Sequence, residues 1–197
     1  MAVNLSKGQR VSLDKNMTMA LVGLGWKANQ FDSGFEYDLD ASAFLLGKNG
    51  KVLRDEDFIF YGNQEHRSGS VKSMGDEQEG NDEDEEGDAE QIFIDFTKVP
   101  PEIEKIAITV TIYDASARKQ NFGQVSNAYV RVARISGPND TVGTEVLRFD
   151  LGEEFSIETA IVVCEIYRSG SEWKFNAVGA GYQGGLEALC RSFGVNV

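Results

Sequence analysis

The sequence predicts a mostly β fold, a β-sandwich of mainly antiparallel strands with a short C-terminal helix. Three observations support this prediction. Apolar residues recur at every second position in short segments, as in strands with one buried face. Turn-forming Gly, Pro, Asn and Asp residues separate these segments. One segment near the C-terminus instead repeats its apolar residues with the period of a helix.

Nine short strands follow from the alternation. In chain order they are Met19–Leu24, Tyr37–Leu46, Phe58–Tyr61, Gln91–Phe96, Ile106–Tyr113, Tyr129–Ile135, Glu145–Leu151, Thr159–Tyr167 and Trp173–Val178. The clearest is Ile106–Tyr113, where branched apolar residues alternate with small or polar ones, so that Thr109 and Thr111 occupy the opposite face. Many short strands separated by turns are typical of a sandwich or a barrel.

The C-terminal helix is predicted from four apolar residues at the spacing i, i+3, i+4 and i+7. These are Leu186, Leu189, Cys190 and Phe193. Gly194 follows where a helix C-cap is expected, and one apolar face predicts packing onto a sheet. No long repeat or Pro-rich linker divides the chain, so we expect a single domain over residues 1–197.

The composition fits a soluble domain with its own core. Of the 197 residues, 41% are hydrophobic and 10% aromatic, enough to fold without metal or disulfide cross-links. The two cysteines, Cys164 and Cys190, lie in apolar settings and indicate buried thiols in a reducing compartment. The N-terminal residues contain no apolar signal stretch, and no apolar run approaches the ~18 residues of a membrane span. We therefore expect a cytoplasmic protein.

The charge is concentrated in one segment. The chain has 32 acidic and 19 basic residues, a net charge of −13. Ten of the carboxylates fall between Asp76 and Glu90 without any basic residue, and the rest of the chain carries a net charge of only −3. This sign disfavours nucleic acid as the main partner and also an anionic membrane surface.

An acidic segment with several glycines indicates a site for a hard divalent cation. It lies in a predicted loop of about thirty residues from Gly62 to Gln91, a length typical of functional or disordered loops. Calcium takes six to eight oxygen ligands from carboxylates and carbonyls, whereas zinc and copper prefer Cys or His, and His66 is the one histidine. A disordered acidic run is the alternative interpretation. Asp38 and Asp40, two carboxylates on one strand face, favour the metal.

The chain also resembles the TerD family of tellurium-resistance and general stress proteins. The matching stretches are Leu5–Gly8, Val22–Trp26, Tyr37–Leu46, Gly75–Asp76, Gly87–Glu90, Ile112–Ala115, Phe122–Ala128, Glu165–Arg168, Trp173–Phe175 and Gly179–Tyr182. They occur in order from one end of the chain to the other. The resemblance implies a calcium-binding β-sandwich without known catalytic activity, encoded in bacterial operons for tellurite, phage or stress resistance.

The same resemblance implies a set of metal ligands. The residues that match the family's ligand motifs are Asp38, Asp40, Asp76, Asp88 and Glu90, with Glu77, Gly75 and Gly80 as weaker candidates. We expect about two Ca²⁺ ions and no other cofactor. Two features depart from the family pattern. Ala89 stands where an aspartate is usual, and the acids Asp82 to Glu86 are additional.

Three function classes follow. The first is a non-catalytic, calcium-binding module that acts through metal-dependent contacts with other proteins of the same stress or resistance system. The second is a metal-dependent phosphoryl hydrolase, because carboxylate-held metals also activate water. The third is a module that binds a small ligand such as a nucleotide. We expect the first, with no catalytic residues; the sequence leaves the oligomeric state open, with a monomer as one option.

Overall fold

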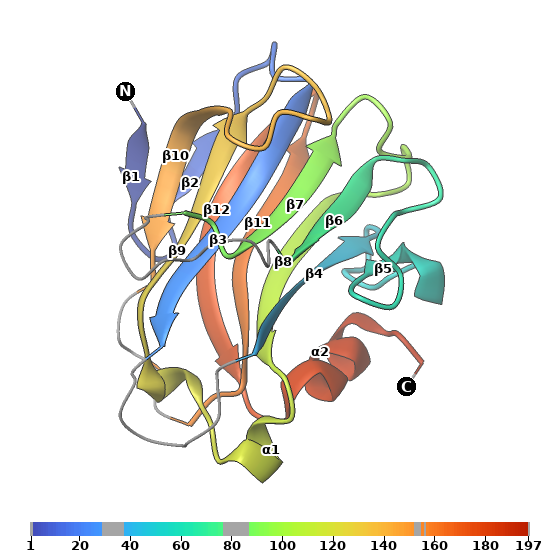
Figure 1. Ribbon diagram of the computed structural model, residues 1–197. Helices are drawn as coiled ribbons and strands as arrows, with labels where there is room; N and C mark the ends of the chain where they lie inside the picture. The colour runs from blue at the N-terminus through green and yellow to red at the C-terminus, as the bar shows by residue number, and fades with distance from the viewer. Residues whose placement is uncertain (1, 29–37, 77–86, 152–154, 156, 197) are drawn as a thin grey trace.

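Two six-stranded sheets pack face to face around a shared apolar core in the computed structural model, which confirms the predicted β-sandwich (Figure 1). The structure describes residues 2–28, 38–76, 87–151, 155 and 157–196. Among the described strands, only β1 and β10 pair in parallel, so the sheets are mainly antiparallel as expected.

The elements are as follows. Sheet A has the order β1 (Val3–Leu5), β10 (Thr144–Asp150), β9 (Val125–Arg134), β3 (Met19–Ala28), β7 (Glu90–Asp95) and β6 (Val71–Asp76). Sheet B has the order β2 (Arg10–Ser12), β12 (Glu172–Tyr182), β11 (Ala160–Ser169), β8 (Lys105–Ile112), β4 (Leu39–Leu46) and β5 (Phe58–Ile59). The helices are α1 (Ala115–Arg118) and α2 (Gly185–Phe193), with 3₁₀ turns η1 (Asp55–Asp57) and η2 (Phe122–Gln124).

Strand β8 shows how the alternation builds the core. Ile106 and Ile108 point inward and are fully buried, while Thr109 and Thr111 occupy the opposite face as predicted. The two threonines are nevertheless buried, because a second apolar layer covers this outer face of sheet B. The sandwich therefore has a core between the sheets and a smaller apolar cluster outside each sheet, the one on sheet A being formed by Leu21, Phe93, Ala133 and Ile135.

Helix α2 provides that second layer. Leu189 and Cys190 are buried against the outer face of sheet B, in a cluster that includes Phe44 of β4. Gly194 caps the helix with φ near +82°, and its N–H donates to the carbonyl of Arg191. Both the predicted helix and its glycine C-cap are confirmed.

The predicted loop from Gly62 to Gln91 is corrected by the structure. Strand β6 lies inside it and pairs with β7 at the edge of sheet A. Of the strand residues 71–75, whose burial is described, only Val71 and Ser73 are buried, so the apolar alternation is too short to stand out in the sequence. Pairing with β7 and burial of Val71 stabilise a strand that local pattern alone does not indicate. The short edge strands β1 and β2 were also not predicted.

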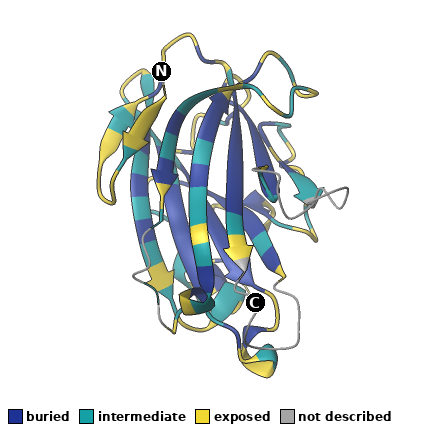
Figure 2. Cartoon of the chain, turned by 60° about the vertical axis from the view of Figure 1, so that its left-hand side comes forward, coloured by how far each residue is buried: buried dark blue, intermediate teal, exposed yellow. Residues whose placement is uncertain are grey.

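Exposure follows the architecture. Exposed residues gather in the turns and in the short strands near the N-terminus, while the central strands are buried along most of their length (Figure 2). Within the described residues, neither helix has the length and apolar character needed to cross a bilayer.

Candidate functional site

The acidic segment is the connection of a β-hairpin. Strand β6 ends at Asp76 and antiparallel β7 begins at Glu90, and these two residues are register partners. Gly75 has φ near +79°, a conformation that glycine adopts without strain, so β6 bends immediately before Asp76. The hairpin therefore brings the two ends of the acidic segment side by side at the edge of sheet A.

The other two predicted ligands lie where β4 begins, on sheet B. Asp38 is exposed and forms a long ion pair with Arg118 of α1, with 3.7 Å between Oδ2 and Nη1. Asp40 is half-buried and pairs in register with Thr111 of β8. Strand β4 packs across the core against β7, so the two acidic strand ends belong to facing parts of the sandwich.

The described carboxylates do not converge on one point. By strand alternation Asp40 lies on the outer face of sheet B with Phe44, whereas Glu90 lies on the inner face of sheet A with Ile92. Among the described residues, no three His, Cys, Asp or Glu side chains gather into a group that could hold a metal ion. The predicted ligands Glu77 and Gly80, and the additional acids Asp82 to Glu86, lie outside the described residues.

Asp88 has a different environment from the other predicted ligands. Its side chain is fully buried on the outer face of sheet A, where Arg131 of β9 binds both of its oxygens. The Nε of Arg131 donates to Oδ1 at 2.7 Å, and Nη2 donates to Oδ2 at 2.6 Å. The amide of Gln91 donates to Oδ2 at 3.0 Å, and the Tyr129 hydroxyl lies 3.3 Å from Oδ1. Four donor atoms therefore surround this carboxylate.

Two glycines of β3 make room for this arrangement. A Cβ atom at Gly23 would lie 2.1 Å from an Asp88 oxygen, and one at Gly25 would lie 2.3 Å from the Tyr129 ring. Such distances are far below van der Waals contact. Glycine inside a strand often marks a close approach of another group, and here it lets a carboxylate and an aromatic ring lie directly on the sheet.

The electrostatics of this cluster follow from its burial. Hydrogen bonding to Asp88 raises the pKa of Arg131, so this guanidinium stays charged. Burial, followed by the negative charge of Asp88, raises the pKa of Tyr129 to about 12. The guanidinium of Arg148 lies over the Tyr129 ring at 3.8 Å, and its Nε donates to Asp150 at 2.8 Å.

Sequence reasoning placed Asp88 among the ligands and missed its partners. Arg131 and Tyr129 lie more than forty residues along the chain, and only the folded sheet brings them to Asp88. A signal was present in Gly23 and Gly25, since two alternate glycines in a strand indicate that something bulky lies against that face.

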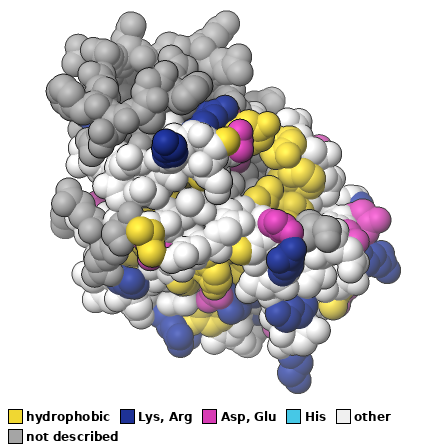
Figure 3. Space-filling model, turned by 90° about the horizontal axis from the view of Figure 1, so that it is seen from below, with side chains coloured by type: hydrophobic (Ala, Val, Ile, Leu, Met, Phe, Trp, Pro, Cys, Tyr) yellow, Lys and Arg dark blue, Asp and Glu magenta, His cyan; other side chains and the backbone are white. Residues whose placement is uncertain are grey.

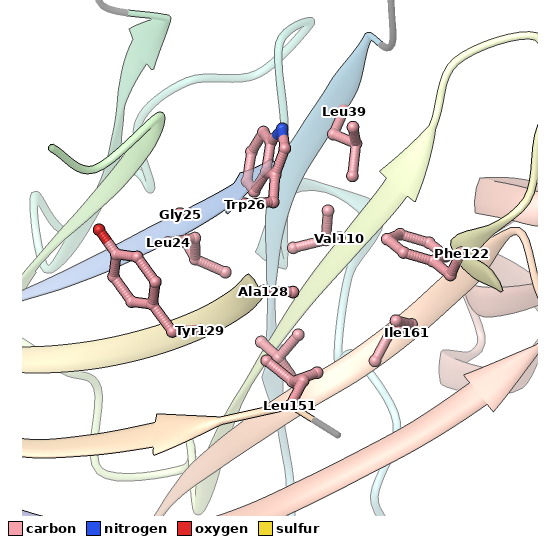
Figure 4. Close-up of a pocket in the computed structure, with 11 residues that line it drawn as sticks. Leu24, Gly25, Trp26, Leu39, Val110, Phe122, Ala128, Tyr129, Leu151 and Ile161 are labelled. Carbon is pink, nitrogen blue, oxygen red and sulfur yellow. The ribbon is translucent and has the colours of Figure 1, made fainter. Parts of the chain in front are cut away.

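An apolar pocket lies between the sheets close to this cluster. Its cavity volume is only about 10 Å³, room for a single water-sized molecule, and its lining includes Leu24, Leu39 and Phe122 (Figure 4). Tyr129 also borders it, with its hydroxyl pointing away from the other lining side chains (Figure 4). Among the described residues that line the pocket there is no cationic side chain, so it offers no charge to a nucleotide phosphate.

Comparison with known proteins gives consistent results. The sequence profile of the TerD domain matches residues 1–193. The tellurium resistance protein TerD of Serratia marcescens is 51% identical over 199 residues, which cover 100% of this chain and 99% of that protein. General stress protein 16U of Bacillus subtilis is 46% identical over 200 residues, covering both chains completely.

A solved structure supports the fold. The crystal structure of a TerD homologue from Streptomyces coelicolor superimposes with a TM-score of 0.64 at 18% identity, covering 88% of this chain and 95% of that one. At this level of identity the match concerns the fold alone.

Proposed function

Since the chain belongs to the TerD family, we propose that it is a calcium-binding, non-catalytic module of a bacterial stress and tellurite-resistance system. Relatives at 46% and 51% identity over the whole chain carry the names general stress protein and tellurium resistance protein. These names support the assignment to a stress and resistance system. The calcium part of the proposal rests on the hairpin that joins Asp76 to Glu90.

The donor chemistry fits calcium. Ten carboxylates within fifteen residues, with no basic residue among them, repel one another unless a cation neutralises them. Oxygen donors of this kind suit Ca²⁺ better than transition metals. The residues that would hold one ion are Gly75, Asp76, Glu77, Gly80 and Glu90 of the hairpin. Asp38 and Asp40 begin β4 on the other sheet, where Asp40 lies on the outer face, so these two would serve a second ion.

A bound cation would neutralise the repulsion between the two strand ends and the segment that joins them. Binding would thereby change the surface offered at this edge of the sandwich, and this change would couple calcium to protein partners. The partners we expect are other proteins of the same system.

The hydrolase alternative has less support. The chain contains a single histidine, His66, which is buried. Its Nε2 lies 3.1 Å from Asp57, and its Nδ1 lies 2.8 Å from the Ser68 hydroxyl. This histidine organises a turn next to η1, and Arg131 is occupied by Asp88. His66 therefore does not serve as a general base at the acidic hairpin, and Arg131 does not serve there as a clamp for a phosphate group.

One face of the molecule carries mixed charge. On the face seen in Figure 3, Lys and Arg side chains lie singly among acidic and apolar ones. A continuous basic surface, as in nucleic-acid-binding proteins, would look different.

Thermal unfolding tests the proposal. After EDTA treatment, Ca²⁺ at about one hundred times its Kd should stabilise the fold by ~2.7 kcal/mol, because the ion binds only the native state. For a chain of this size the melting temperature should rise by roughly 5–10 °C. Equimolar Mg²⁺ should have a smaller effect, and phosphatase activity should be absent with either ion. A melting temperature that does not respond to Ca²⁺ would contradict the proposal.

A further inference from the structure

We propose that Asp88 is a positioning residue, which fastens the end of the acidic segment to sheet A through Arg131, rather than a calcium ligand. We call Asp88, Gln91, Tyr129 and Arg131 together the latch. The structural part of this inference stands on its own contacts, and only its consequence for calcium rests on the proposed function.

The bonding around Asp88 leaves little capacity for a metal. Both carboxylate oxygens accept bonds from the Arg131 guanidinium, and Oδ2 also accepts one from Gln91. The Tyr129 hydroxyl, whose single proton is shared with the Gly87 carbonyl, lies 3.3 Å from Oδ1. The side chain is fully buried. A cation approaching it would have to displace a guanidinium held by two short charge-assisted bonds, and would be repelled by that positive charge.

The cradle around Asp88 is fixed from several elements. Arg131 also donates through Nη1 to the carbonyl of Val142 at 3.2 Å, and Gln91 donates to the carbonyl of Thr141 at 2.9 Å. These bonds tie the latch to the connection between β9 and β10. Asp88 lies directly against the backbone of Gly23, where any side chain would overlap its carboxylate.

Three successive residues are held at this point. The carbonyl of Gly87 accepts a bond from Tyr129 at 3.1 Å, and the side chain of Asp88 is bound by Arg131. The Ala89 N–H donates to the carbonyl of Leu24 at 2.8 Å. The chain is thus fixed immediately before Glu90, which begins β7 opposite Asp76.

The latch has a defined consequence for the hairpin. It holds the C-terminal end of the acidic segment on sheet A whether or not metal is present, as β6 holds the N-terminal end. Preordered ligands bind more tightly than ligands that must be ordered on binding. Loosening the latch should therefore weaken calcium binding, even though Asp88 itself makes no bond to the ion.

Two variants and their combination test the structural part without metal. In EDTA, Asp88→Asn and Arg131→Gln should each lower the melting temperature and accelerate hydrogen exchange at the Ala89 amide. The double variant should be no worse than the poorer single one, because both changes remove the same interaction. Arg134→Gln is the matched control, since Arg134 lies on the same strand but pairs with Asp14 at the surface. Additive effects, or unchanged exchange at Ala89, would overturn the latch.

A third variant covers the case in which the charge changes prevent folding. Gly23→Ala removes no charge and no donor, but its methyl group would push Asp88 off the sheet. The latch requires faster exchange at Ala89 in this variant, measured in EDTA. Exchange as slow as in the wild type would count against it.

Calcium titration of Arg131→Gln separates positioning from ligation by the sign of the change. If Asp88 were a ligand, removing the guanidinium would free its carboxylate and tighten calcium binding. If Asp88 is a positioning residue, both Arg131→Gln and Asp88→Asn should weaken calcium binding by a similar factor. The factor is about tenfold if the fraction of molecules with the end of the acidic segment held on sheet A falls to a tenth. Tighter binding in Arg131→Gln would overturn the assignment. If the wild type itself binds no calcium, the proposed function fails, while the measurements in EDTA still decide the latch.

Discussion

The outer faces of the two sheets are covered by different means. On sheet B, helix α2 buries Leu189 and Cys190 against Phe44 in an apolar cluster. On sheet A, a smaller apolar cluster around Leu21 and Phe93 is joined by the buried ion pair of Asp88 and Arg131, which holds the chain against the strands. Apolar burial is non-directional and tolerates small adjustments, whereas a charge-assisted pair depends on both partners. Sheet B is thus covered by an apolar layer, while the charge pair on sheet A holds the end of the segment that we propose binds calcium.

The largest loss of stability is expected when the apolar layer between α2 and sheet B is disrupted. Leu189→Ala removes a fully buried side chain from between α2 and sheet B and should cost roughly 2–5 kcal/mol of unfolding free energy. Urea unfolding in EDTA measures this loss. Calcium affinity should stay unchanged, because α2 contributes no proposed ligand. A loss below about 1 kcal/mol would mean that the helix can collapse onto the cavity.

The next largest loss of stability is expected when the ion pair of Asp88 and Arg131 on sheet A is removed. Asp88→Asn should cost about 2 kcal/mol in EDTA, less than the ~3–5 kcal/mol typical of removing one partner of a fully buried pair. The amide keeps one acceptor for Arg131, and the Arg131 side chain retains 16% exposure. Urea unfolding against the Arg134→Gln control measures the difference. Equal stability of the two variants would show that the latched face does not depend on its charge pair.

Most of the scaffold could be predicted because its signals are local. The alternation of β8 and the helical spacing of α2 each depend on a few neighbouring residues, and both predictions are confirmed. The fold class follows from summing many such segments. Strand β6 was missed because its stability comes from pairing with β7, a tertiary contact that a short stretch of sequence does not record.

The candidate site was less predictable for the same reason. Asp88 looks like its acidic neighbours in the sequence, and only its contact with Arg131, forty-three residues away, distinguishes it. Asp76 and Glu90 are side by side because β6 exists. The ligand set of the hairpin therefore stays a prediction, and we propose that Asp88 positions the segment instead of binding the ion.

A smaller effect is expected in the pH dependence of the melting temperature, through Tyr129 of the latch. The pKa of Tyr129 is raised to about 12 in the folded state, above its ordinary value of 10.0. A raised pKa contributes stability that is fully present below pH 10 and is lost as the pH rises from 10 towards 12. Melting temperatures of the wild type should therefore fall more steeply over this range than those of Tyr129→Phe. Parallel curves would mean that the hydroxyl near Asp88 ionises as it would in water.

The smallest effect concerns the exposed face of α2. Glu187 and Arg191 form an i,i+4 ion pair whose side chains are 60% and 70% exposed. Glu187→Gln should change the unfolding free energy by only ~0.3–0.5 kcal/mol, and this change should vanish in high salt. Urea unfolding at low and high salt measures it. A cost comparable to that of Asp88→Asn would remove the distinction between exposed and buried pairs.

Backbone amide NMR during a Ca²⁺ titration of the EDTA-treated protein tests the central claim most directly. Saturable shifts should appear and be largest near Asp38, Asp40, Asp76 and Glu90, while the amides of α2 should not shift. The Ala89 amide should stay protected from exchange throughout, because the latch is closed with and without metal. Absence of saturable shifts, or shifts centred on α2, would contradict the claim that calcium binds at the acidic hairpin.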